Sequence, residues 1–155
     1  MLYAVIGLLL VVIDQITKFL VVRNIPLYAE IPVIKNVLSL TYVKNTGAAW
    51  GSFSDNTVFL TALVIIILVC ISFYVYKNKI NNIWFGTGIT LVYSGAIGNL
   101  IDRFARGGAV VDMIKTEFID FPVFNFADCC VVIGAILFAI YIIFYCDDNK
   151  ENKNG

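Results

Sequence analysis

The stretch Leu2–Val22, LYAVIGLLLVVIDQITKFLVV, decides which class of fold this chain adopts. A helix of about 20 apolar residues is long enough to cross the hydrocarbon core of a bilayer, and this stretch has 21 residues. The sequence therefore predicts an α-helical integral membrane protein with four transmembrane helices. Three further runs of 18 to 20 residues supply the other spans: Thr57–Tyr76, Ile83–Ile101 and Cys129–Cys146.

The composition agrees with a membrane protein and excludes several classes of enzyme. Of the 155 residues, 60% are hydrophobic and 14% are charged, whereas soluble domains are about 25% charged. Eleven basic residues balance eleven acidic ones, so the charge does not indicate a nucleic-acid partner. Histidine is absent, which excludes Ser-His-Asp and Cys-His catalysis and the HExxH zinc motif.

The connections between the spans indicate how the chain is oriented. Lys77 and Lys79 lie in a short connection, and basic residues in short loops face the cytoplasm. Six further basic residues lie in the two long connections, but short loops carry more weight in this rule. We therefore expect both termini in the cytoplasm. The predicted organisation is a single membrane domain, 1–155, with extracytoplasmic loops 23–56 and 102–128, a cytoplasmic loop 77–82 and a cytoplasmic tail 147–155.

The two long loops have distinct local patterns. Val37–Lys44 alternates apolar and polar residues, which predicts a short β-strand. Phe118–Phe124 is rich in aromatic residues, which favours an interfacial loop at the level of the lipid headgroups. We expect a small extracytoplasmic β-strand region beside this loop.

Asp14 and Lys18 are the two charged residues inside the predicted spans. Asp14 lies eight residues before the end of its span, which is about 12 Å of helix. The two residues are four positions apart, so they can pair on one face of the helix. Pairing relieves part of the cost of a charge in the bilayer. This favours a structural pair over a catalytic role, and Gln15 can hydrogen-bond to a neighbouring helix.

Two further carboxylates lie close to the predicted membrane boundary. Asn125 and Asp128 have the spacing of a capping box at the start of the last span, and capping alone is one interpretation of Asp128. A carboxylate at the lipid boundary is costly unless it is paired or used. Asp112 has apolar neighbours on both sides, so it is either a solvated loop charge or a desolvated functional group with a raised pKa.

A pair of aspartates provides the chemistry that a chain without histidine needs. Two adjacent carboxylates can share one proton, so that the neutral one acts as an acid while the ionised one activates water. Carboxylates alone at a lipid interface suit Mg²⁺ or Ca²⁺ poorly. We therefore expect an aspartyl site with no metal and no organic cofactor.

Five segments together resemble one known family, the bacterial lipoprotein signal peptidases (signal peptidase II). They occur in the expected order along the chain. Met113 is one departure, because phenylalanine is common at that position. The segments are Asp14-Gln-x-x-Lys18, Asn45-Thr-Gly-Ala-Ala49, Gly95-Ala-x-Gly-Asn-x-x-Asp-Arg103, Val110-Val-Asp112 and Phe124-Asn-x-Ala-Asp128.

The resemblance implies an intramembrane aspartyl endopeptidase of the bacterial cell (inner) membrane. Such an enzyme removes the signal peptide from a diacylglyceryl-modified prolipoprotein by cutting on the N-terminal side of the lipidated cysteine. The expected partners are these substrates and membrane lipid, with no nucleic acid, and we expect a monomer. By resemblance, Asp112 and Asp128 are the catalytic dyad, Asn99, Arg103 and Asn125 are polar residues around it, and Asp14, Lys18 and Asn45 occupy supporting or substrate-contacting positions.

The helix dipole distinguishes the two catalytic candidates. Asp128 lies in the predicted first turn of the last helix, where a negative charge is stabilised. Asp112 is expected in a loop without such support. We therefore expect Asp128 to hold the charge and Asp112 the shared proton, although the two titrate as a coupled pair.

One alternative comes from a different class of function, a small proton-coupled membrane transporter. Such a protein needs polar groups near the midplane and a path across both leaflets. The spans Thr57–Tyr76 and Cys129–Cys146 contain no charge, which disfavours this alternative. A structural or assembly factor leaves the aspartate pair without an explanation.

Overall fold

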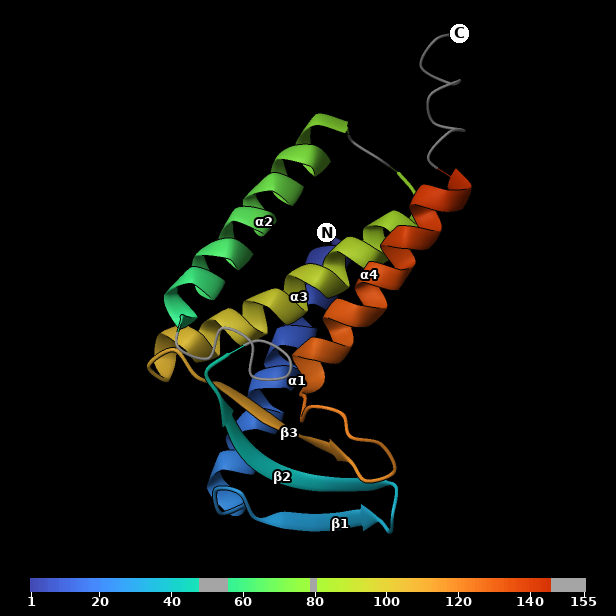
Figure 1. Ribbon diagram of the computed structural model, residues 1–155. Coiled ribbons are helices and arrows are strands. Elements are labelled where there is room, and N and C mark those ends of the chain that lie inside the picture. The colour runs from blue at the N-terminus through green and yellow to red at the C-terminus, as the bar shows by residue number, and fades with distance from the viewer. Residues whose placement is uncertain (48–55, 79–80, 146–155) are drawn as a thin grey trace, which may run out of the picture.

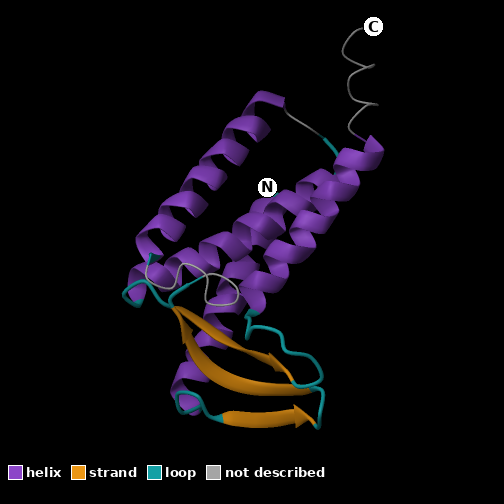
Figure 2. Cartoon of the chain, in the orientation of Figure 1, coloured by secondary structure: helices purple, strands orange, loops and turns teal. Residues whose placement is uncertain are grey.

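The computed structural model describes residues 1–47, 56–78 and 81–145 (Figures 1 and 2). Within these residues the chain forms four helices and three strands, with the sheet at one end of the helices (Figure 2). The helices are α1 (Leu2–Asn24), α2 (Thr57–Asn78), α3 (Ile83–Ala105) and α4 (Phe126–Tyr145), and the strands are β1 (Glu30–Ile34), β2 (Leu38–Asn45) and β3 (Val110–Thr116).

Three helices in the described part of the chain, α1, α2 and α4, are long and apolar enough to cross a membrane. This confirms three of the predicted spans. The α3 helix has 23 residues, as α1 does, but small and polar residues interrupt its apolar run and it does not belong to this set. It packs against both α1 and α4, whereas α2 stands further from the other helices (Figure 1).

Apolar side chains cover the outside of the helices. Leu8, Phe73 and Ile143 are each at least 65% exposed, which suits a protein whose solvent is lipid. Because lipid tails are as apolar as leucine, close packing of small residues must hold such helices together.

Glycines bring α3 and α4 into very close contact. A Cβ atom at Gly88 would lie 2.9 Å from the carbonyl oxygen of Gly134, and a Cβ at Gly134 would lie 2.7 Å from that of Gly88. Nearer the sheet, a Cβ at Gly95 would collide with the carbonyl oxygen of Ala127. This contact fixes the start of α4 against the polar end of α3.

The sheet is antiparallel in the order β1-β2-β3. Its central strand, β2, coincides with the strand predicted at Val37–Lys44 to within one residue at each end. A small core forms where the sheet packs on the end of α1, and Met113 lies inside it. The residue that departs from the family pattern therefore packs beneath the sheet. The buried members of this core are Val21, Ile25, Tyr42, Val111 and Met113.

One prediction about the third connection is wrong. Asp112 does not lie in a loop but in the middle of β3, opposite Val43 of β2. Gly107 and Gly108 make this possible, because their φ angles of +64° and +92° are accessible to glycine at little cost. They end α3 and turn the chain back into the sheet. The pairing partner of β3 is distant in sequence, so the local pattern does not reveal it.

Candidate active site

Asp112 is a buried carboxylate held by two amides. Its side chain is 2% exposed. Its Oδ1 atom accepts a hydrogen bond of 2.6 Å from Asn125 Nδ2, and its Oδ2 atom accepts one of 2.8 Å from Asn45 Nδ2. Burial raises the pKa of Asp112 to about 6; the negative charge of Asp128 adds to this rise and the two amide donors oppose it. Of the two interpretations of Asp112 made from the sequence, this burial agrees with the desolvated functional group and excludes the solvated loop charge.

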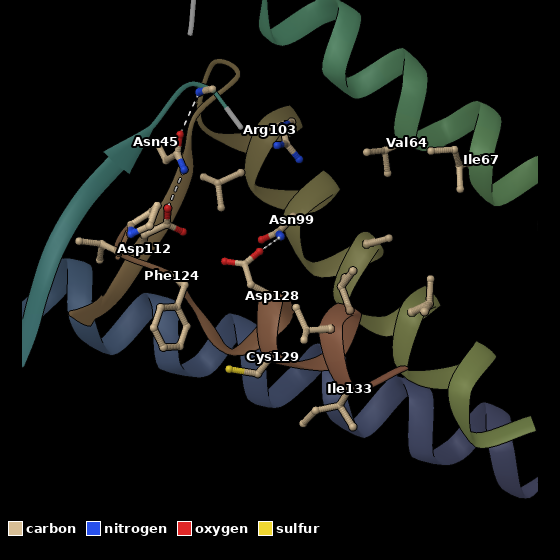
Figure 3. Close-up of a pocket in the computed structure, with 18 of the residues that line it drawn as sticks. Asn45, Val64, Ile67, Asn99, Arg103, Asp112, Phe124, Asp128, Cys129 and Ile133 are labelled. Carbon is tan, nitrogen blue, oxygen red and sulfur yellow. Dashed lines mark hydrogen bonds between the residues drawn. The ribbon is translucent and has the colours of Figure 1, made fainter. Parts of the chain in front are cut away.

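Asp128 lies in the first turn of α4 and forms the predicted capping box. Its Oδ2 atom accepts from the backbone N–H of Asn125 at 3.0 Å, and Asn125 Oδ1 accepts from the backbone N–H of Asp128 at 3.0 Å. The other carboxylate oxygen, Oδ1, accepts from Asn99 Nδ2 at 2.8 Å. Capping is therefore not the whole function of Asp128, because one oxygen faces a side chain of α3 (Figure 3).

Asn125 links the surroundings of both aspartates. Its side chain is fully buried. Besides its bond to Asp112, Nδ2 donates to Asn99 Oδ1 at 3.2 Å. Through this amide, residues of β3, α3 and α4 share one hydrogen-bond network.

A buried ionic cluster lies behind this network. Lys18 Nζ is 2.9 Å from Asp14 Oδ2, which confirms the predicted pair on α1. It is also 3.3 Å from Asp102 Oδ2 and donates to Asn99 Oδ1 at 2.9 Å. Asp14 Oδ1 accepts from the backbone N–H of Ala127 at 3.0 Å. All three charged side chains are at most 1% exposed, so one ammonium group faces two carboxylates inside the bundle.

Gln15 makes the interhelical hydrogen bond expected of it. Its Nε2 atom donates to the carbonyl oxygen of Gly98 at 3.0 Å. The missing side chain of Gly98 is itself needed, because a Cβ there would lie 2.5 Å from Asp14 Oδ2. The α1 helix therefore contacts α3 through polar groups at the depth of the site.

Asp102 is a buried charged residue that the sequence interpretation did not select as a site residue. It is fully buried, pairs with Lys18 and, at 3.2 Å, with Arg106 Nε, and accepts from the backbone N–H of Val111 at 2.9 Å. It therefore joins α1, α3 and the start of β3. Two features of the sequence could have indicated Asp102: it lies in the segment that ends at Arg103, and it is four residues before Arg106.

The network lines a cavity of about 700 Å³ with mostly apolar walls. This volume lies within the range of small-molecule and cofactor sites. The guanidinium of Arg103 also lines the cavity, where it is attracted by the carboxylates of Asp128, Asp112 and Asp102. The lining comprises Asn45, Asn99, Arg103, Asp112 and Asp128 as polar residues, and the walls include Val64 and Ile67 of α2, Val92 and Ala96 of α3, Phe121–Phe124, and Val131–Ile133 of α4 (Figure 3).

Seven of the eight selected site residues thus belong to one hydrogen-bonded cluster, and Arg103 lies on the same cavity wall. Two carboxylates in such surroundings can act as an acid and a base. Among the described residues, no group of three or more His, Cys, Asp or Glu side chains could hold a metal ion. The seven clustered residues are Asp14, Lys18, Asn45, Asn99, Asp112, Asn125 and Asp128.

Comparison with known families identifies the chain. A family model described as signal peptidase (SPase) II matches residues 6–144. The chain belongs to the signal peptidase II family. As a member of this family it is a peptidase, and the transporter alternative is not supported.

Curated relatives of the signal peptidase II family match almost the whole chain. The lipoprotein signal peptidase of Enterococcus faecalis is 44% identical over 153 residues, which covers 99% of this chain and 94% of the relative. The lipoprotein signal peptidase of Lactococcus lactis subsp. lactis is 46% identical over 143 residues, which covers 92% and 91%.

Two solved structures, both described as bacterial membrane enzymes, have the same fold. One has a TM-score of 0.85 and 36% identity and covers 91% of this chain and 87% of its own. The other has a TM-score of 0.83 and 35% identity, with coverage of 92% and 93%. The shared fold therefore covers most of the helices and the sheet described above.

Proposed function

We propose that this peptidase removes the signal peptide from diacylglyceryl-modified prolipoproteins, with Asp112 and Asp128 as its catalytic dyad. The observation that carries the proposal is the placement of two carboxylates in one amide network at the wall of an apolar cavity. Relatives named lipoprotein signal peptidases support the choice of substrate. Cleavage occurs on the N-terminal side of the lipidated cysteine.

The two aspartates have different roles in the proposed reaction. Asp128 receives two N–H donors in the first turn of a helix, which favours the carboxylate. Asp112 is buried with a raised pKa and so holds the shared proton. The Asp128 carboxylate takes a proton from water as the water oxygen attacks the scissile carbonyl carbon, and Asp112 protonates the carbonyl oxygen. As the resulting diol collapses, one of its hydroxyls returns a proton to Asp112, the C–N bond breaks, and Asp128 gives its proton to the leaving amine, which restores the dyad.

The apolar walls suit the lipid-bearing part of the substrate. Diacylglyceryl chains come from the bilayer, which is as apolar as these walls, and side chains from α2 and α4 give the cavity an apolar lining against which the chains can pack without contact with water. The guanidinium of Arg103 lines the same cavity and is attracted by the carboxylates of Asp112 and Asp128, and its N–H groups can donate to carbonyl oxygens of the substrate. These contacts place the scissile bond beside the dyad.

The proposed membrane arrangement has four spans. The α3 helix is the fourth, because its 23 residues are sufficient to cross a bilayer and its Asn99 side chain bonds to Lys18 of α1 and Asp128 of α4 rather than facing lipid. The sheet and the long loops then lie on the extracytoplasmic side, and both termini are cytoplasmic. A monomer contains every residue of the site, and the site is supplied with water from outside and with substrate from the bilayer.

A cleavage assay in lipid vesicles tests the proposed function. The purified protein is reconstituted and given one prolipoprotein in two forms, with and without the diacylglyceryl group on its cysteine. We expect mass spectrometry to detect a mature protein that begins at the lipidated cysteine, and little product from the unmodified form. Absence of cleavage of the lipidated form would overturn the proposed function, and equal cleavage of both forms would overturn recognition of the lipid.

A further inference from the structure

We propose that Lys18 is a positioning residue, whose ammonium group sets the orientation of the Asn99 amide and thereby directs an N–H donor at Asp128. This inference rests on the proposed role of Asp128. It assigns to the buried pair on α1 a function beyond holding the helices together.

The ammonium group of Lys18 has no freedom to serve a different acceptor. It carries three N–H donors and no acceptor. Three oxygens surround it, from Asp14 at 2.9 Å, Asp102 at 3.3 Å and Asn99 at 2.9 Å. Since the side chain is fully buried, each donor is matched to one oxygen.

This arrangement permits one orientation of the Asn99 amide. Its Oδ1 atom accepts from Lys18 and from Asn125 Nδ2, and its Nδ2 atom donates to Asp128 Oδ1. Rotating the amide by half a turn would bring its NH₂ group against two donors and its oxygen against the carboxylate of Asp128. All three contacts would become repulsive, so the ammonium group of Lys18, supported by the N–H of Asn125, directs the NH₂ group of Asn99 at Asp128.

The other two amides of the network are oriented by the backbone. Asn125 Oδ1 accepts from the backbone N–H of Asp128, and Asn45 Oδ1 accepts from that of Gly47 at 2.9 Å. Both amides therefore keep their NH₂ groups toward Asp112 without help from a charged group. Asn99 is the amide of this network whose oxygen accepts from a charged donor.

A pair of substitutions removes the ammonium group while keeping the charges balanced. Lys18→Met alone leaves Asp14 buried without its cation, which is strongly destabilising. In the double variant Asp14→Asn/Lys18→Met both charges disappear, and the amide oxygen introduced on α1 can still accept from the backbone N–H of Ala127. Asp102 retains Arg106 and the N–H of Val111. The matched surface control is Lys115→Met, which removes an ion pair to Glu30 on the exposed sheet and leaves activity unchanged.

A double-mutant cycle with Asn99 distinguishes positioning from a structural role. We expect Asp14→Asn/Lys18→Met to lower kcat about 10- to 100-fold relative to Asp14→Asn, with little change in KM, which is the effect of losing a hydrogen bond to a charged group. In an Asn99→Ala background the same change should have almost no further effect on kcat, because the amide it orients is gone. An equal loss in both backgrounds, or a loss confined to KM or to thermal stability, would overturn the inference.

A spectroscopic measurement on the unsubstituted protein and the double variant is independent of activity. With asparagine side chains labelled with ¹⁵N and aspartate with ¹³C, solid-state NMR in lipid should detect Asn99 Nδ2 in direct contact with the carboxyl carbon of Asp128. Loss of that contact in Asp14→Asn/Lys18→Met supports the inference, and its persistence would overturn it. If the protein proved unable to cleave prolipoproteins, the proposed function would fail while this measurement still decided the orientation.

Discussion

Three asparagine amides surround the two carboxylates, and each presents its NH₂ group to a carboxylate oxygen. Asn45 and Asn125 donate to Asp112, and Asn99 donates to Asp128. Such donors stabilise the ionised form of an acid. For Asp112, burial outweighs them, and its pKa rises to about 6. Asp112 therefore keeps its proton at pH values at which an exposed aspartate is already ionised.

The pH dependence of cleavage should report this balance. Because Asp112 acts when protonated, kcat/KM should fall as pH rises through about 6. The Asn45 N–H favours the charged form, so Asn45→Ala should raise the pKa of Asp112 and move the falling limb to higher pH. The measurement is kcat/KM between about pH 4 and 9, with Thr46→Ala, an exposed neighbour, as the control. A limb that stays in place or moves to lower pH would contradict the assignment of the proton to Asp112.

The contacts predicted from sequence were those that local spacing determines. The Asp14–Lys18 pair and the Asn125–Asp128 capping box each depend on one helix. The bonds of the Asn99 amide, by contrast, reach residues 26, 29 and 81 positions away. No local sequence pattern predicts contacts between residues so far apart. The family resemblance identified Asn99 as a site residue but did not indicate which residues it contacts.

Among the helices and strands, the contact between α3 and α4 has the most direct effect on the site. Gly95 faces the carbonyl oxygen of Ala127, one residue before Asp128. The helices were predictable because apolar runs of sufficient length mark them. The β3 strand was not, because it is stabilised by pairing with β2, about 70 residues earlier in the chain, and Asp112 was therefore assigned to a loop.

A methyl group at Gly95 should separate the two helices. The obstructing atom belongs to the backbone and cannot rotate away, so Gly95→Ala should destabilise the protein by about 1–3 kcal/mol. It should also lower kcat by displacing Asp128. Gly7→Ala is the matched control, since its Cβ would lie 3.3 Å from a serine hydroxyl that can rotate. Thermal unfolding in detergent and the cleavage assay provide the two readouts, and equal behaviour of the two variants would refute the packing argument.

The molecule as a whole places its polar site at the end of the helices that carries the sheet (Figure 1). Apolar side chains cover the helices outside, as a lipid solvent requires. The orientation of this arrangement in the membrane rests on the basic residues of the short loop.

Cysteine labelling in intact cells tests that orientation. In a background with the four native cysteines replaced by alanine, Lys35→Cys in the turn between β1 and β2 should react with a membrane-impermeant maleimide. Lys77→Cys, at the end of α2, should react only after lysis. Both positions are exposed, so access depends on the side of the membrane. The reverse pattern would place the termini and the short loop outside.

The central claim is that Asp112 and Asp128 together hydrolyse the signal peptide bond, and single neutral substitutions test it most directly. Asp112→Asn and Asp128→Asn are reconstituted in vesicles with the lipidated prolipoprotein, beside Asp120→Asn, a control on the exposed loop before α4. We predict that each dyad variant folds as the parent does and loses cleavage by about 10²–10⁴-fold or more, while the control cleaves normally. Retention of parental activity by either dyad variant would contradict the claim.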